Sequence, residues 1–177
     1  YNNQMPFELV GDFSFNITNH LSAQYFLNKG LKTFSPSYDL NFQQLEELLA
    51  PNQLAKAAEV TIHQYMPSFH MEHCVFASFM SDGSTIKDCG MPCVKNDVAL
   101  VDAKKINHPV LADQEWRNTM FNGVPQSAGS MIPKLLGLGV SQYRMEALTE
   151  DSQVLREKVI AYTDVLCGNS DAKSLYQ

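Results

Sequence analysis

The chain has 177 residues, of which 45% are hydrophobic and 18% are charged, and 19 acidic against 13 basic side chains give a formal net charge of −6. This apolar content supports a substantial core, which excludes an intrinsically disordered protein, and the length suits one domain or part of a larger one. The acidic balance argues against nucleic acid as a partner, since binding of phosphates needs a basic surface, and no run of about 18 apolar residues predicts a transmembrane segment.

The chain begins with Tyr1, and no basic and apolar leader segment precedes it. We take this to indicate an N-terminus that was processed or trimmed. Because no membrane-spanning segment is predicted, we expect a soluble, intracellular protein, and processing leaves an organelle open as its compartment.

Strands and helices alternate through the first third of the chain. The spacing of apolar residues predicts strands over 7–16, 31–36 and 59–66 and helices over 21–29 and 41–50. Gly30 follows the first helix as a C-terminal cap, Asp39 or Asn41 supplies the N-cap of the second helix, and Pro51 ends it. The third strand leads into a cysteine-containing segment instead of a helix.

Residues 70–126 have no regular period, with Gly, Pro, Asp and Asn scattered through them. Short apolar runs at 98–101 and 109–112 predict the two strands of a hairpin-like insertion. Such a long non-periodic stretch inside a compact chain is commonly functional. The alternation then resumes with a helix near 128–136, a strand over 141–146 and a helix over 151–166, at whose start Thr149, Glu150 and Asp151 offer an N-cap.

Strands that alternate with helices predict an α/β protein with a parallel sheet. About four such units are too few for a closed eightfold barrel, which takes about 250 residues. We predict a single domain over residues 1–177, in which 70–126 form the insertion. No glycine-rich phosphate loop follows any strand, so nothing local supports nucleotide binding.

Three of the four cysteines, Cys74, Cys89 and Cys93, lie within the insertion, whereas Cys167 lies far from them. A chain of this size with a good core needs no disulfides, so the clustering favours a metal or iron–sulfur site over ordinary reduced thiols. Zinc would need a fourth ligand, which His70 or His73 could supply, and an iron–sulfur cluster would need a fourth thiolate or a substitute. The alternative for both histidines, and for His63, is a hydrogen-bonded structural role.

The adjacent residues Glu72, His73 and Cys74 offer a base, an acid and a nucleophile, because an imidazole activates a neighbouring thiol. Consecutive residues of a strand, however, point to opposite faces. This geometry argues against a hydrolytic Cys–His dyad made from the triplet.

A series of short motifs follows in a fixed order over residues 7–166. They are Gly11-Asp12 with Asn16, Pro36-Ser37-Tyr38-Asp39-Leu40-Asn41, Met71-Glu72-His73-Cys74, Asp88-Cys89-Gly90-Met91-Pro92-Cys93, Arg117-Asn118-Thr119 and Pro125-Gln126-Ser127-Ala128. Together they resemble peptidase family U32, the collagenase-like peptidases.

The resemblance implies a TIM-type (β/α) barrel, of which this chain looks like the C-terminal half, a partial barrel of about four β/α units. A half barrel exposes two sheet edges, which need a cover. The expected partner is therefore the missing N-terminal half barrel or another protein chain in a larger assembly.

The better understood relatives in this family are oxygen-independent hydroxylases of RNA bases or of the ubiquinone ring, which carry a 4Fe–4S cluster on cysteines. Cys74, Cys89 and Cys93 match three of the family's cysteine positions. Two positions depart from the pattern, since Ala77 and Trp116 stand where the family commonly has cysteine. Cys167 matches no family position.

Two hypotheses follow, and the second is slightly favoured. In the first, the chain is an iron–sulfur enzyme of the hydroxylase type, with Glu72, His73 and Arg117 as supporting or substrate-binding groups. In the second, it is a degenerate, non-catalytic relative that serves as a structural component of a complex. Zinc is the alternative metal, a decayed site would hold none, and a protease rests on the family name alone.

Overall fold

A computed structural model describes residues 7–83, 85–113 and 115–176 of the chain. The chain divides into two compact units. The first unit comprises the residues up to His63 and those from Ser127 onward, and the second unit comprises Gln64–Gln126.

The first unit is built on short parallel strands. β1 (Leu9–Gly11) pairs with β2 (Leu31–Phe34), and β3 (Glu59–Gln64) pairs with β9 (Gln142–Met145). A parallel bridge between Phe34 and Ala58 links these pairs, and β8 (Gln126–Ser127) lies on the other side of β3 from β9. No sheet in the described part of the chain closes into a barrel, so the architecture is mixed α/β with several sheets.

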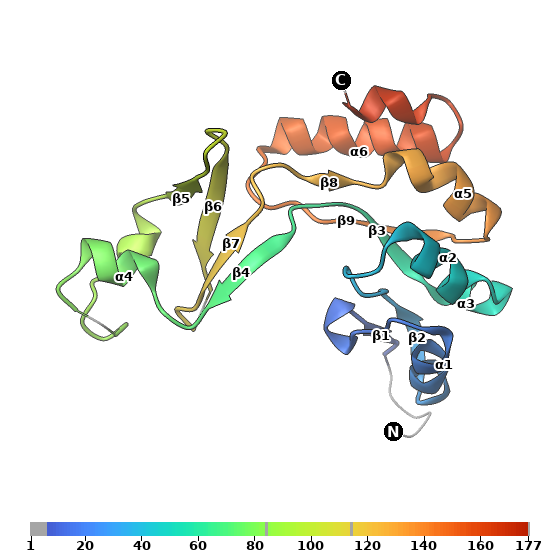
Figure 1. The fold of residues 1–177 in the computed structure, drawn as a ribbon, viewed down its shortest axis with the longest axis horizontal. Helices are drawn as coiled ribbons and strands as arrows, with labels where there is room; N and C mark the ends of the chain where they lie inside the picture. The colour runs from blue at the N-terminus through green and yellow to red at the C-terminus, as the bar shows by residue number, and fades with distance from the viewer. Residues whose placement is uncertain (1–6, 84, 114, 177) are drawn as a thin grey trace. The chain divides into compact units, whose positions relative to one another are not determined.

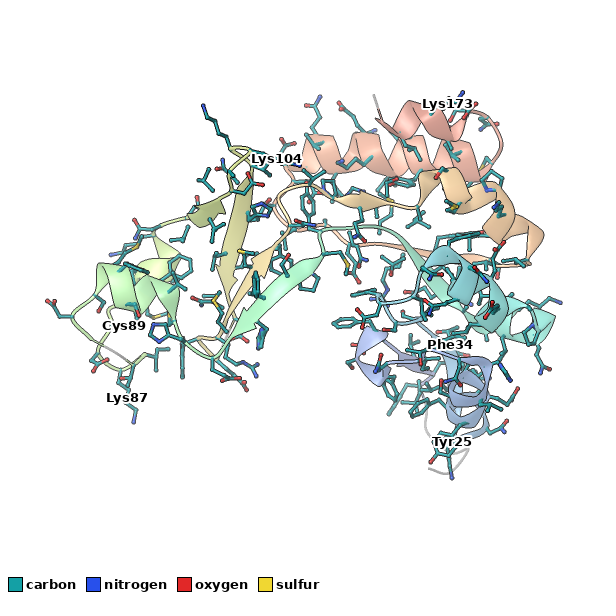
Figure 2. The ribbon with its side chains drawn as sticks, in the orientation of Figure 1. Tyr25, Phe34, Lys87, Cys89, Lys104 and Lys173 are labelled. Atoms are coloured by element: carbon teal, nitrogen blue, oxygen red, sulfur yellow. The ribbon has the colours of Figure 1, made fainter. Side chains whose placement is uncertain are left out.

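Helices follow the strands of the first unit and supply its core. They are α1 (His20–Asn28), α2 (Phe42–Leu49), α3 (Asn52–Ala57), α5 (Ile132–Gly137) and α6 (Ser152–Leu166), as Figure 1 shows. Phe34, which Figure 2 labels on β2, is completely buried together with Leu49 and Ile132. These residues belong to one apolar cluster that holds the helices against the strands.

The helix caps account for two predicted boundaries. Asn41 caps α2, because its side chain accepts from the Gln44 amide while the Gln44 side chain accepts from the Asn41 amide. Asp151 caps α6 by accepting from the amides of Gln153 and Val154. The N-caps predicted for these helices are confirmed at Asn41 and Asp151.

Two predicted elements are shorter than expected. The strand predicted over 7–16 ends at Gly11, because the Asp12 side chain accepts from the Ser14 amide and starts a 3-10 helix, Phe13–Phe15. The helix predicted near 128–136 begins with a 3-10 turn, Gly129–Met131, and becomes α-helical at Ile132. Pro133 lies in the first turn of α5, where its missing N–H costs no hydrogen bond.

The second unit is an antiparallel sheet with one short helix. Its strand order is β4-β7-β6-β5, made of β4 (Pro67–Met71), β5 (Val98–Val101), β6 (Asn107–Ala112) and β7 (Asn118–Phe121). The predicted hairpin is confirmed as β5 and β6, whereas β4, β7 and the helix α4 (Val75–Met80) were not predicted. The unit has its own small core of Phe76, Val110 and Met120.

Candidate functional site

Three cysteines of the second unit line one cavity of about 460 Å³. They are Cys74, Cys89 and Cys93, and all three are half-buried free thiols. The other described walls are Glu72, His73, Ala77, Thr85, Ile86, Lys87, Met91, Pro92, Glu115 and Trp116. Figure 2 labels Cys89 and Lys87 on the loop that follows α4. The fourth cysteine, Cys167, is exposed and belongs to the first unit.

Cys74 is held at the start of α4, where it is the N-cap residue. The Ala77 amide donates to Cys74 Sγ at 3.5 Å, and Asn118 Nδ2 on β7 lies 3.9 Å from the same sulfur. Asn118 is fully buried, and its Oδ1 accepts from the Val75 amide at 2.7 Å. One amide side chain therefore fixes both the start of the helix and the thiol that precedes it.

Cys89 and Cys93 flank a turn made by two left-handed residues. Gly90 has φ +69° and Met91 has φ +53°, and the Met91 amide donates to Cys89 Sγ at 3.4 Å. A positive φ at a residue other than glycine is uncommon and is often found where a turn presents a ligand. The bend brings the two thiols to the same cavity.

Three thiols form a donor set that suits either an iron–sulfur cluster or a zinc ion with one further ligand. Thiolates are the ligands of such clusters, and hydrogen bonds to the sulfurs, like those from the Ala77 and Met91 amides, tune them. Zinc would need its sulfur donors about 2.3 Å from one point. Among the described residues, no group of three His, Cys, Asp or Glu side chains is placed to hold a metal ion.

The two positions that depart from the family pattern face the same cavity. Ala77 on α4 and Trp116 both line it. Trp116 has φ +62° and is 39% exposed, and it lies in a turn whose Asp113 carbonyl accepts from the Trp116 amide. An indole thus occupies a wall of the cavity where the resemblance led us to expect a fourth thiol.

Glu72, His73 and Cys74 all line this cavity, which corrects the argument from strand geometry. That argument placed them on a strand, but β4 ends at Met71, and the next residues form a bend before α4. A bend does not impose the alternation of faces. His73 Nε2 nonetheless contacts Ser78 Oγ one helical turn away, so the imidazole is directed along α4.

Arg117 supports the turn next to the cavity. Its Nε lies 3.0 Å from Asp113 Oδ2, and a terminal nitrogen lies 2.8 Å from Glu115 Oε2. The hydrogen bond to Asp113, together with the nearby carboxylates of Glu115 and Glu72, raises the pKa of Arg117 above its ordinary value. The guanidinium therefore stays charged and holds the turn that presents Glu115 and Trp116.

The predicted histidines take separate places. His73 lines the cavity, whereas His70 on β4 hydrogen-bonds Thr119 Oγ1 on β7 at 2.9 Å. His63 lies in the first unit. Of the two histidines considered as zinc ligands, the structure brings only His73 to the cysteines.

Asn118 was not among the predicted site residues, although it lies inside a motif that carries the family resemblance. Asn118→Ala should lower the free energy of unfolding of the second unit by about 1–3 kcal/mol, because the amide of the half-buried Val75 loses its acceptor. Thr119→Val, at the next position of β7, removes only the contact with His70 and buries no charge, so its effect should be smaller. Urea unfolding followed by amide exchange in β6 and β7 measures both. Equal losses in the two variants would contradict the assignment of the Val75 contact as the stabilising one.

A family model of peptidase family U32 matches residues 1–174 of the chain. The chain belongs to peptidase family U32. The resemblance inferred from its motifs is thereby confirmed. No curated protein and no solved structure matches the chain. Among the described helices of this U32 member, none is long and apolar enough to cross a membrane.

Proposed function

We propose that this U32 chain binds a 4Fe–4S cluster in its second unit through Cys74, Cys89 and Cys93. The observation that carries the proposal is the cavity that these three thiols line together. Ala77 and Trp116, which stand where the resemblance leads us to expect further cysteines, favour instead the structural role. Three thiolates leave one iron without a protein ligand, which is open to a substrate or an external ligand.

The reaction class we propose is an oxygen-independent hydroxylation, in which the oxygen atom comes from water and the substrate loses two electrons. When bound, the cluster would carry these electrons from the substrate to an external acceptor. The residues of the chain would bind and orient the substrate. Glu72 and Glu115 place carboxylates on the cavity wall, and His73 adds an imidazole that can donate or accept a proton. Trp116 offers an apolar face against which a ring can pack. The net charge of −6 favours a small molecule over an RNA base as the substrate.

Metal analysis tests the proposal directly. We expect anaerobically purified protein to be brown and to contain about four iron atoms and about four sulfide ions per chain. One zinc ion per chain with no sulfide would contradict the cluster and would indicate a structural zinc site instead. Absence of iron, sulfide and zinc would overturn the proposal and leave the scaffold role described next.

A structural role in an assembly is the second candidate, and the open edge of β1 favours it. In the described residues β1 pairs only with β2. A groove of about 500 Å³ lies beside this edge, lined by Leu9, Val10, Phe15, Tyr25, Phe26, Lys29 and Leu31. Most of these walls are apolar, and Val10, Phe15 and Tyr25 are exposed.

The occupant we propose for this surface is the N-terminal half of a TIM-type barrel, supplied by another chain or by another part of a longer one. It would add a strand to β1 and cover the apolar groove. Light scattering after size-exclusion chromatography tests this candidate. Self-association that Val10→Lys reverses would show that the edge of β1 is open to strand pairing, as this occupant requires, because a charge at an edge blocks such pairing. A stable, monodisperse monomer of these 177 residues would contradict it.

A further inference from the structure

Four polar side chains in the interior of the first unit are linked by a series of contacts, and none of the four belongs to the proposed cluster site. Glu150 Oε1 lies 3.3 Å from His63 Nε2, and His63 Nδ1 lies 3.3 Å from the Tyr162 hydroxyl. The same hydroxyl lies 2.7 Å from Ser127 Oγ. In the tautomer that carries its proton on Nε2, a neutral imidazole donates to Glu150 and accepts from the Tyr162 hydroxyl at Nδ1. His63 and Tyr162 are each 3% exposed, so these contacts are shielded from water.

The chain of contacts joins the two places where the polypeptide passes between the units. His63 is the last residue of the first unit before the chain enters the second, and Ser127 is the first after it returns. Tyr162 comes from α6, and Glu150 comes from the segment between β9 and α6. A single hydroxyl therefore contacts both crossing residues.

Backbone hydrogen bonds lie directly beside these contacts. The Ala128 amide donates to the Ile62 carbonyl at 2.9 Å, and the Glu146 amide donates to the His63 carbonyl at 2.9 Å. The Ala128 amide is protected while the outgoing and returning segments stay together, and the Glu146 amide is protected while His63 stays beside the segment that follows β9. They are therefore suitable reporters of local opening.

We propose that Tyr162, His63 and Glu150 form a buried clamp that holds together the outgoing and returning segments of the chain, and that the clamp weakens in acid. The geometry supports the first part, since Tyr162 bonds both segments from a separate helix. The second part follows from the chemistry of the groups around the imidazole. Glu150 faces it from the β9–α6 segment, and Tyr162 and Lys158 face it from α6.

The direction of the pH effect can be derived from these groups. Burial lowers the pKa of His63 below its ordinary value of 6.5, and Lys158 lowers it further, while the contact with Glu150 opposes both. The folded state therefore prefers the neutral imidazole. Its contribution to stability is complete above pH 6.5 and is lost as the pH falls from there toward the folded-state pKa.

Glu150 acts in the same direction at lower pH. Its burial raises the pKa, but the amides of Leu148 and Glu150 and the contact with His63 outweigh this, so the pKa lies below 4.5. Its contribution is present above pH 4.5 and is lost below it. Between about pH 7 and pH 5 the effect should therefore come from His63.

Amide hydrogen exchange on the full chain tests the clamp. Tyr162→Phe removes the contacts with both His63 and Ser127, so it should speed exchange at Ala128 and Glu146 by at least about fivefold, the effect of one hydrogen bond. Tyr143→Phe is the matched control, because it removes a hydroxyl that donates only to the Val140 carbonyl in the same unit. The Ser35 amide, which donates to the Gly11 carbonyl, should not change in either variant. Equal acceleration in both variants, or none in Tyr162→Phe, would overturn the clamp.

The pH dependence is tested with the same reporters, after correction for intrinsic exchange rates. Opening at Ala128 should increase in the natural chain between about pH 7 and pH 5 and should be flat in His63→Gln. Tyr162→Phe retains the imidazole, so it should open faster at every pH and keep the slope. If His63→Gln does not fold, a flat profile in Tyr162→Phe and in the natural chain would overturn the acid sensitivity. A slope in folded His63→Gln equal to that of the natural chain would do the same.

Discussion

Cys89→Ser should lower the iron and sulfide content to less than about one tenth of that of the natural chain. Only three thiols line the cavity, so each removal leaves two, which is too few to hold a cluster. Cys89 also receives the Met91 amide, which is the contact that orders the left-handed turn. Loss of the thiol therefore removes both a ligand and an anchor of the turn.

Cys167→Ser is the matched control for this prediction. Cys167 is an exposed free thiol that follows α6, outside the cavity. Its replacement should leave the iron and sulfide content and the visible absorbance unchanged. The cluster proposal fails if Cys89→Ser keeps its iron, and a loss of equal size in Cys167→Ser would move the ligand set away from the second unit. Assembly of the first unit with a partner should be unaffected by Cys89→Ser.

The first unit could be predicted from the sequence because its elements carry clear periods and caps. The strands predicted over 31–36 and 59–66 are close to β2 and β3, and the helix predicted over 151–166 is close to α6. Each buries one face in a large shared core, so the apolar pattern records the fold. Where a side chain bonds the backbone instead, as Asp12 does, the pattern continues but the strand stops.

The second unit could be predicted only in part, because its elements do not bury a face in a large shared core. Its core has three buried residues, so β4, α4 and β7 show little periodicity. The clustering of cysteines pointed to a shared site, but no local pattern revealed that Asn118 reaches Cys74 from a distant strand. The left-handed turn at Trp116 was equally hidden, because Asp113 creates it through contacts within its own loop.

The same limit applies to the buried chain of Glu150, His63, Tyr162 and Ser127. These residues come together only because β3 pairs with both β8 and β9. Pairing between strands far apart in the sequence leaves no mark in the local period of either strand. Buried polar residues of this kind are therefore found from the fold, and their function must be argued from contacts.

Phe34→Ala should lower the free energy of unfolding of the first unit by about 3–5 kcal/mol. Phe34 is 0% exposed and lies at the bridge to Ala58, which joins the β1–β2 pair to β3. Truncation leaves a cavity where these strands meet the helices, and a loss of this size is a large share of the typical stability of a domain. Urea unfolding monitored by far-ultraviolet circular dichroism and by exchange of the Ser35 amide measures it.

Phe79→Ala is the control for this substitution, since Phe79 is 84% exposed and should change stability by less than about 0.5 kcal/mol. Because Phe76, Val110 and Met120 form a separate core, Phe34→Ala should leave amide protection in β6 and β7 nearly unchanged at low urea. A parallel loss of protection in both units would mean that they unfold as one cooperative body. The cysteine site would then depend on the packing of Phe34, and metal content would have to be measured again in that variant.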